Sequence, residues 1–293
     1  MDTVPAHYGQ QFSTNLKALL QQKVSRLRPT VDVKSGYRGE QVSPVDQLGP
    51  VEMKEVEDRD APKQKSTLPR ERRWVAPLDA DLTLRIDTFE KLRLLMDPNS
   101  EYVQAAHMAA ERKFDDRILN GYYASAMTGK TGSTPKAFLA GNVIAVNYGA
   151  GANVGMTVPK LLELKRLARV REIDIKADPI TVVLTSGEEQ DLLKEAQVIS
   201  LDYNDRPVLV DGELKSFLGF RFEYCERVPV DGDTYRRVPA YCKSGVHLAI
   251  WEDIRTSINK RVDIKGEPWE VYVYLVANAT RIEEEKCFEI KCA

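Results

Sequence analysis

The sequence carries little net charge, few histidines and no long apolar run. Its 42 basic and 44 acidic side chains leave a formal net charge of -2 over 293 residues. This balance argues against a dedicated nucleic-acid-binding protein, because such proteins usually carry a strong basic excess. No apolar stretch approaches the roughly 20 residues that a membrane-spanning helix needs, and the N-terminus lacks the basic and apolar regions of a signal peptide. The composition predicts an ordinary globular protein with a sizeable core.

The cysteines and histidines form no recognisable site. The four cysteines all lie in the last quarter of the chain, at Cys225, Cys242, Cys287 and Cys292. A secreted disulfide scaffold would be shorter and richer in cysteine, and the spacing of the last two, with no histidine nearby, is not that of a zinc site. The three histidines are far apart and belong to no HExxH motif or Cys–His pair. We therefore expect reduced structural thiols, no metal, no cofactor and no catalytic residues.

Two glycine-containing segments resemble phosphate-binding loops. Residues 124–131 (ASAMTGKT) match a relaxed Walker A motif, but that motif needs a strand before it and a helix after it. Here a helical pattern precedes, and Pro135 prevents a helix from starting directly afterwards. In residues 149–155 (GAGANVG) the glycines are spaced one residue too far apart for the dinucleotide fingerprint. We expect a helix end at Gly129 and a glycine turn, and a nucleotide-binding enzyme using the Gly129-Lys130-Thr131 loop is the least favoured alternative.

Hydrophobic periodicity predicts a mixture of helices and strands. Helical spacing predicts an amphipathic helix over residues 10–27 and a long helix over about 101–127, which begins after the N-cap residue Ser100. Strict alternation predicts a strand over 79–87, and a short helix follows from 88. The other expected elements are a strand at 137–147, a helix at 159–173, a strand at 179–185, a helix at 186–199 that begins with a capping box at 186–189, and mostly strands from 207 with one helical stretch at 251–259.

Residues 29–75 differ in composition from the rest of the chain. They contain several prolines and glycines and few aliphatic side chains, and their charges are segregated into an acidic half at 52–60 and a basic half at 63–73. A structureless loop of this length inside a compact domain is improbable. Short alternating pieces indicate a long two-stranded flap that packs on another molecule, with Trp74 as an anchor where the chain leaves it.

Three segments near the C-terminus carry a family pattern. They are residues 207–229 (PVLVDGELKSFLGFRFEYCERVP), 240–258 (AYCKSGVHLAIWEDIRTSI) and 269–290 (WEVYVYLVANATRIEEEKCFEI). In this order they resemble the axial-domain strands and the last strands of tailed-phage major capsid proteins, with Asn278 where glycine is common. The preceding arm, charged loop and long helix also follow in the order expected of the Hong Kong ninety-seven-type capsid fold. The sequence thus resembles this family over roughly its whole length.

The resemblance implies an α+β fold of five parts. These are an N-terminal arm (1–35), an extended loop (36–78), a peripheral domain with the spine helix (79–175), an axial domain (176–264) and C-terminal strands that return to the peripheral domain (265–293). The implied function is that of the major capsid (head) protein of a tailed double-stranded DNA bacteriophage. Such a protein is not an enzyme, assembles into hexamers and pentamers of an icosahedral shell around the genome, and is found in the virion after assembly in the bacterial host cytoplasm.

The resemblance also implies partners. Besides further copies of the chain, we expect a separate scaffolding protein, a portal, a cement protein and packaged DNA held by non-specific contacts, with no membrane. An encapsulin-like nanocompartment shell protein is the main alternative, and the long proline-rich loop slightly favours the virus. The loop residues expected to contact neighbouring subunits are Glu52, Glu55, Asp58, Lys63, Lys65, Arg70, Arg72, Arg73 and Trp74.

Overall fold

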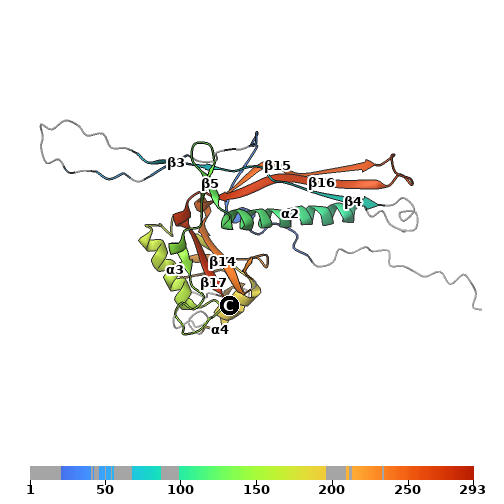
Figure 1. Ribbon diagram of the computed structural model, residues 1–293. Helices are drawn as coiled ribbons and strands as arrows, with labels where there is room; N and C mark the ends of the chain where they lie inside the picture. Colours follow the sequence, from blue (N-terminus) through green and yellow to red (C-terminus); the bar gives the residue numbers. More distant parts are fainter. Residues whose placement is uncertain are drawn as a thin grey trace, which may run out of the picture. The chain divides into compact units, whose positions relative to one another are not determined.

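The computed structural model describes residues 21–40, 42, 46–49, 51–53, 55, 68–86, 99–195, 209–210, 213–232 and 234–293. The chain divides into two compact units, each built from segments far apart in sequence. The smaller unit comprises Met1–Val24, Asp79–Arg112 and Ile254–Leu275, and the larger comprises Ser25–Leu78, Lys113–Asp253 and Val276–Ala293. The elements are labelled in Figure 1. The five-part division given by the resemblance stays a prediction.

Helices are few and strands are many in the described residues. The α-helices are α2 (Asn99–Tyr123), α3 (Val158–Val170) and α4 (Ser186–Lys194), and the short 3-10 turns are η1 (Arg28–Thr30), η2 (Ala140–Asn142), η3 (Lys243–Gly245) and η4 (Glu284–Lys286). The strands are β1 (Asp32–Ser35), β2 (Asp46–Leu48), β3 (Arg70–Trp74), β4 (Asp79–Ile86), β5 (Ala126–Thr128), β6 (Thr134–Lys136), β7 (Val143–Ile144), β8 (Ile180–Leu184), β9 (Leu209–Val210), β10 (Glu213–Leu214), β11 (Ser216–Phe217), β12 (Phe220–Tyr224), β13 (Val230–Asp231), β14 (Tyr235–Cys242), β15 (Val246–Lys260), β16 (Trp269–Arg281) and β17 (Cys287–Cys292). No helix in the described residues is long and apolar enough to cross a membrane.

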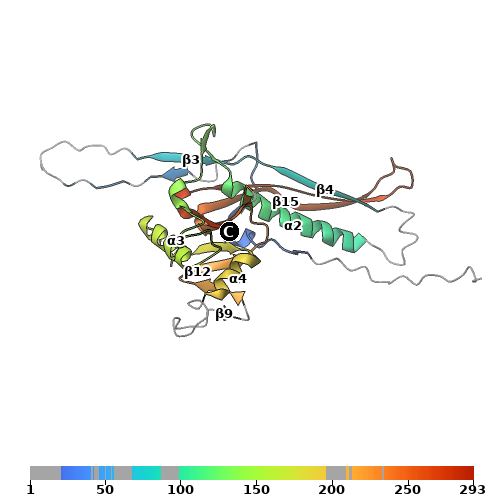
Figure 2. The ribbon, with the colours of Figure 1, turned by 60° about the horizontal axis from the view of Figure 1, so that its bottom comes forward.

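The main core of the larger unit lies between a seven-stranded sheet and two helices. The sheet has the order β11-β12-β8-β14-β17-β7, with β13 paired to β14. All five side chains of β8 are buried, as its continuous apolar sequence predicts for a central strand. The apolar stripe of α3 (Leu161, Leu164, Ala168) packs into the same core, and Figure 2 shows α3 and α4 beside this sheet. Thr185 and Glu188 form the capping box of α4, one residue earlier than the sequence pattern indicates.

A second sheet has the order β1-β15-β16-β4. In the larger unit, β1 pairs in parallel with the start of β15, where Val33 is opposite Leu248. In the smaller unit, β16 alternates between buried side chains (Val271, Val273) and half-buried ones, so this sheet has one covered face.

The C-terminal end of α2 is fixed to the end of β16. Arg281 is completely buried, and its guanidinium donates hydrogen bonds to the backbone oxygens of Tyr122 and, at 2.6 Å, Ala124. These are carbonyl groups that the end of a helix leaves without intrahelical partners. A Cβ added to Gly121 would overlap the backbone of Ala279, so the close approach of the two elements depends on glycine in the helix. Asn278 instead donates a hydrogen bond to the oxygen of Ala76 at 2.8 Å.

Several predicted elements differ from the structure in type or extent. The helices expected to end at 173 and 199 end at Val170 and Lys194, and three other elements differ more. The helical stretch expected at 251–259 is part of strand β15, which lies beside β16 in the sheet. Strand pairing overrides a short apolar pattern that fits the helical period and the strand period equally well. The spine helix ends at Tyr123 rather than 127, because Ala126–Thr128 forms β5 between β3 and β6. The strand expected at 137–147 is reduced to Val143–Ile144, which follows the 3-10 turn Ala140–Asn142.

The predicted N-terminal helix does not extend to residue 27. Residues 21–27 are not helical. The buried Asp115 carboxylate accepts hydrogen bonds from the Ser25 hydroxyl at 2.6 Å and from the amides of Arg26 and Leu27 at 3.3 and 3.0 Å. These contacts hold the segment in a turn against α2, since the same amides would otherwise bond within a helix. Residues 10–20 and the short helix expected from 88 lie outside the described residues.

Candidate functional site

The predicted flap is a β-hairpin whose two strands are described at its base. β2 and β3 pair antiparallel, with Asp46 opposite Arg72 and Leu48 opposite Arg70, and an isolated bridge joins Val42 to Val75. β3 continues the sheet through β5 to β6. This four-stranded sheet presents alternate side chains of β3 on opposite faces.

One face of the hairpin base is anchored to the segment that follows β16. Arg73 is 1% exposed, and its guanidinium donates to the Ile282 oxygen at 2.7 Å and pairs with Glu284 at 2.5 Å and with Glu71 at 3.1 Å. The Lys136 ammonium lies 2.9 Å from the same Glu71 carboxylate and is the largest cause of its lowered pKa. Arg73, expected to contact a neighbour, therefore uses its charge inside the subunit.

Sequence reasoning missed the partners that complete this anchor. Gln47 donates to the Ile282 oxygen at 2.5 Å, and Glu284, which is buried, lies 211 positions from Arg73 along the chain. The only local signal is alternation: in Arg-Glu-Arg-Arg-Trp, Glu71 and Arg73 share one face of a strand. Nothing in the sequence indicates which face is the buried one.

The opposite face of the hairpin base is exposed. The Arg72 guanidinium makes two hydrogen bonds with the Asp46 carboxylate, at 2.5 and 2.8 Å, and lies 5.7 Å from the centre of the Trp74 ring. The Trp74 indole donates to the Gly129 oxygen at 2.7 Å, which ties β3 to the β5–β6 turn. Arg70 is exposed, so this face offers a basic and aromatic surface to another molecule.

Beyond β2 the chain continues without covering its own apolar side chains. Glu52 and Glu55 are exposed, Val51 is 50% exposed and Met53 is 99% exposed. Three of the other predicted contact residues, Asp58, Lys63 and Lys65, lie outside the described residues. The described acidic part of the loop therefore has no core of its own.

A cavity of about 890 Å³ lies beside the anchor. It is lined by Arg73, Lys136 and Glu284 together with residues of the hairpin and of turns η3 and η4. Its lining contains both acidic and basic side chains, and most of them are paired with each other. Within the described part of the chain, no group of histidine, cysteine, aspartate or glutamate side chains has an arrangement suited to a metal ion.

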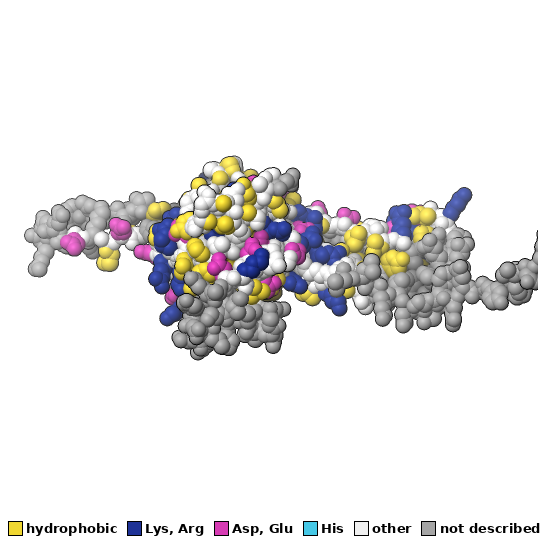
Figure 3. All heavy atoms as spheres, turned by 90° about the horizontal axis from the view of Figure 1, so that it is seen from below, with side chains coloured by type: hydrophobic (Ala, Val, Ile, Leu, Met, Phe, Trp, Pro, Cys, Tyr) yellow, Lys and Arg dark blue, Asp and Glu magenta, His cyan; other side chains and the backbone are white. Residues whose placement is uncertain are grey.

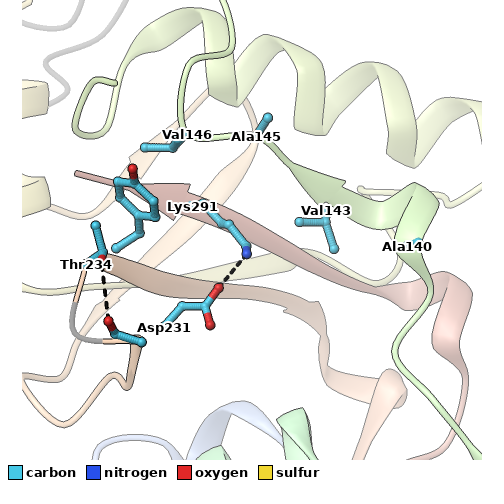
Figure 4. A pocket seen from close by; sticks show the side chains of 9 residues that line it. Ala140, Val143, Ala145, Val146, Asp231, Thr234 and Lys291 are labelled. Carbon is cyan, nitrogen blue, oxygen red and sulfur yellow. Dashed lines mark hydrogen bonds and ion pairs between the residues drawn. The ribbon is translucent and has the colours of Figure 1, made fainter. Parts of the chain in front are cut away.

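A shallower depression of about 610 Å³ lies next to strands β13 and β17 (Figure 4). The Lys291 ammonium lies 2.5 Å from the Asp231 carboxylate and is the main cause of the lowered pKa of that carboxyl. Val143 and Val146 form an apolar wall. This paired, neutral arrangement contains no nucleophile beside a general base, which a catalytic site would need.

Neither glycine segment forms a phosphate-binding loop. Lys130 and Thr131 lie in the turn between the antiparallel strands β5 and β6, not between a strand and a helix. Gly155 lies directly against the Asp191 carboxylate of α4, which would repel a phosphate. The structure thus contradicts the nucleotide-binding alternative at both positions.

The four thiols and the His247 imidazole are buried structural groups. All four cysteines are free and buried, and burial raises the pKa of Cys225 to about 11 and of Cys292 to about 12. Thiols of this kind are inert. His247 is 1% exposed, and its ring lies between the Asp32 carboxylate at 2.6 Å and the Tyr37 hydroxyl at 3.0 Å, so it links β1 to β15.

The face of the molecule drawn in Figure 3 carries mixed charges. Lysine and arginine side chains are interspersed with aspartate and glutamate on the face shown in Figure 3. This distribution agrees with a net charge of -2.

Comparison with known proteins identifies the family. A family model described as phage capsid protein matches residues 4–293. Among solved structures, the capsid of the cyanophage P-SCSP1u has a TM-score of 0.77 at 10% identity, covering 98% of this chain and 93% of that chain. The capsid of Ralstonia phage GP4 has a TM-score of 0.70 at 12% identity, covering 98% and 95%. The capsid of Myoviridae phage XM1 has a TM-score of 0.64 at 18% identity, covering 100% and 99%. No curated protein matches the chain.

These matches agree with the described structure. They extend over nearly the whole chain and confirm the α+β capsid fold that the C-terminal segments indicate. The elements of that fold present here include the hairpin β2–β3, the long helix α2 and the seven-stranded sheet. The chain belongs to the phage capsid protein family.

Proposed function

We propose that this chain is the major capsid protein of a tailed double-stranded DNA bacteriophage. It forms hexamers and pentamers of an icosahedral shell that encloses the genome, it resides in the virion, and it carries no catalytic activity. The observation that supports this most directly is the hairpin β2–β3, which is anchored to the subunit at its base but leaves Val51 and Met53 exposed beyond it.

The two faces of the hairpin base have different tasks in this proposal. The Arg73–Glu284 pair fixes the direction in which the hairpin leaves the subunit, because a buried pair with several hydrogen bonds has a single geometry. The exposed face is available to neighbouring subunits. The contact residues are then Glu52, Glu55, Asp58, Lys63, Lys65, Arg70, Arg72 and Trp74, with Arg73 as a positioning residue.

Weak contacts suffice for such an assembly. Exposed ion pairs each contribute little, but a closed symmetric shell repeats every contact in every subunit, so many small terms add. A net charge near zero also limits repulsion between copies. A separate scaffolding protein, a portal, a cement protein and packaged DNA are the further partners in this proposal, and the five-part division into arm, loop, peripheral domain, axial domain and C-terminal strands belongs to it as well.

Negative-stain electron microscopy of the purified chain, after size exclusion, tests the proposal. Rings of five or six subunits or closed shells are the expected result. A variant in which residues 50–67 are replaced by a short Gly-Ser linker should keep the far-ultraviolet circular dichroism of the folded body but form no shells. A stable compact dimer from the unmodified chain, with or without coexpressed scaffolding protein, would contradict the proposal.

The contents of native particles separate the virus from an encapsulin-like compartment. Particles of a phage contain double-stranded DNA, whereas a nanocompartment contains an enzyme. Nuclease-resistant DNA in particles purified from the producing cells is expected here, and a protein cargo without DNA would support the alternative.

A further inference from the structure

One carboxylate oxygen of the cavity beside the hairpin anchor has no hydrogen-bond donor within the subunit. Glu284 lines this cavity of about 890 Å³ and is 6% exposed. Its Oε2 atom accepts a hydrogen bond from Arg73 at 2.5 Å and lies 3.5 Å from the Lys136 ammonium. Its Oε1 atom is also buried and accepts no hydrogen bond from the described part of the chain. Because buried polar atoms are almost always hydrogen-bonded, this oxygen is placed to accept a donor from a bound molecule.

Contacts on both sides fix the position of this oxygen. The Asn142 side-chain amide, which is completely buried, donates to the backbone oxygen of Glu284 at 3.0 Å and to that of Cys287 at 2.9 Å. These hydrogen bonds hold the backbone of turn η4, while Arg73 holds the Oε2 atom of the same carboxylate. The Oε1 atom is therefore a preformed acceptor, as the polar groups of small-molecule sites usually are.

The lining of the cavity carries more negative than positive charge. Six carboxylates and four basic side chains line it. The negative excess remains when Arg171 is added, which lies 3.8 Å from Glu285 but outside the lining. Asp178 accepts a hydrogen bond from the Ser244 hydroxyl and forms no salt bridge within the described residues. The cavity thus has two carboxylates, those of Glu284 and Asp178, that can each accept a further donor.

These acceptors suit N–H donors better than a metal ion. An ionised carboxylate only accepts hydrogen bonds, whereas a hard divalent cation needs about six or more oxygen ligands. No group of acidic side chains among the described residues has an arrangement suited to a metal ion. Leu48, Pro69 and Ile282 also line the cavity, so an aliphatic chain would find apolar contacts there.

We propose that this cavity binds a short aliphatic diamine. One ammonium group donates to Oε1 of Glu284, the other donates to the Asp178 carboxylate, and the methylene chain lies against Leu48 and Ile282. Hydrogen bonds between two charged groups are among the strongest in proteins, so two such contacts can hold a small ligand. This inference goes beyond the proposed function and does not depend on it, because the whole lining belongs to the larger unit of one subunit.

A bound diamine ties the base of the hairpin to the rest of the larger unit. Leu48, Gly49 and Pro69 line the cavity from the hairpin, whereas Asp178 and Glu284 line it from segments outside the hairpin. The Gly49 amide donates to the Pro69 oxygen at 2.8 Å. Binding should slow the hydrogen exchange of this amide, because opening of the hairpin would also break contacts with the ligand.

Isothermal titration calorimetry of the unassembled full chain with 1,4-diaminobutane tests the site. Saturable binding of one equivalent is the expected result. The matched probe is 1-aminobutane, which has a single ammonium group and should bind about tenfold more weakly. All titrations are run at the same ionic strength, because general screening of negative charge depends on salt and not on a second ammonium group.

Three variants locate the ligand. Glu284→Gln keeps an oxygen for Arg73 but removes the second carboxylate oxygen, so it should raise the Kd of the diamine about tenfold. Asp178→Asn leaves the Arg73 pair intact and should abolish the preference for the diamine over 1-aminobutane, which keeps the test decisive if the first variant does not fold. Glu289→Gln is the control and should leave the Kd unchanged, since Glu289 is 2% exposed and pairs with Arg237 at 2.7 Å but does not line this cavity.

Several results would overturn the proposal. They are the lack of saturable binding to the unmodified chain, equal affinity for the two amines, and equal weakening of binding by Glu284→Gln and by the control. Displacement of the diamine by equimolar magnesium chloride would show a general attraction of cations instead of a diamine site. Slower hydrogen exchange confined to residues away from Gly49 would place the ligand elsewhere on the subunit.

Discussion

Replacing Lys160 by methionine should destabilise the subunit although Lys160 takes no part in the proposed contacts. Lys160 lies in the first turn of α3 and is completely buried. Its ammonium donates hydrogen bonds of 2.8 Å to the backbone oxygens of Val154, Gly155 and Lys291. It therefore joins the glycine turn and α3 to the last strand of the sheet, β17.

The magnitude follows from what the substitution leaves behind. Methionine keeps the length of the side chain, so little cavity forms, but three buried carbonyl groups lose their donor. An unsatisfied buried polar group costs about 1–3 kcal/mol. Part of this loss is offset, because the variant no longer has to remove a charged ammonium group from water. The burial of this ammonium group is the main cause of the lowered pKa of Lys160. We expect a net loss of about 3 kcal/mol in the free energy of unfolding.

Urea denaturation of the unassembled subunit, followed by far-ultraviolet circular dichroism, measures the effect. Lys165→Met is the matched control, because Lys165 is on the same helix but lines a shallow surface groove. The control should stay within about 0.5 kcal/mol of the unmodified chain. A Lys160→Met subunit that is as stable as the control would refute the assignment of these three hydrogen bonds as a stabilising tie.

Two further predictions concern the sheet β1-β15-β16-β4. Gly121→Ala should lower the melting temperature, because the added Cβ overlaps the backbone of Ala279. The cost of overpacking, about 1–3 kcal/mol, exceeds the gain in helix propensity of about 1 kcal/mol. The control is Gly151→Ala, which should leave the melting temperature unchanged because its Cβ meets open space. Burial lowers the pKa of His247, so the unfolded chain binds a proton on this ring more readily than the folded chain does. The pairing of β1 with β15 should therefore be most stable above about pH 6.5 and should weaken as the pH falls below that value. Hydrogen exchange of the Val33 amide should report this loss, and His247→Gln should abolish its pH dependence.

Elements with strong local signals could be predicted from the sequence. The five apolar residues of β8, the Pro159 start of α3 and the capping box of α4 each depend on neighbours a few positions away. The spine helix was predicted for the same reason, although it begins at Asn99, before the expected N-cap Ser100, and ends at Tyr123. The absence of a Walker A loop was predicted, because that loop requires flanking elements that the local sequence does not provide. The helix end expected at Gly129 is wrong, because α2 ends at Tyr123 and Gly129 lies in the turn between strands β5 and β6.

Elements that depend on distant partners could not be predicted. Residues 251–259 fit a helical period as well as a strand, and their place in β15 beside strand β16 decides between them. The sequence pattern at residues 25–27 predicts a helix, but these residues are not helical. The Asp115 carboxylate, about 90 positions away, accepts hydrogen bonds from the Ser25 hydroxyl and from the two backbone amides that follow it.

The candidate contact residues show the same division. Alternation in the strand and segregation of charge along the loop are properties of the sequence alone, and they predicted a charged hairpin with Trp74 at its exit. Only the tertiary structure decided that Arg73 is buried against Glu284 while Arg70 and Arg72 stay exposed.

The sequence by itself determined the family, the mixed fold and the places where helices begin, because these are written in patterns a few residues long or in their order along the chain. The tertiary structure decided which charged side chains are buried and paired and which stay exposed. The physical reason is that burial depends on surfaces contributed by segments such as β3 and η4, which are far apart in sequence and meet only when the chain has folded.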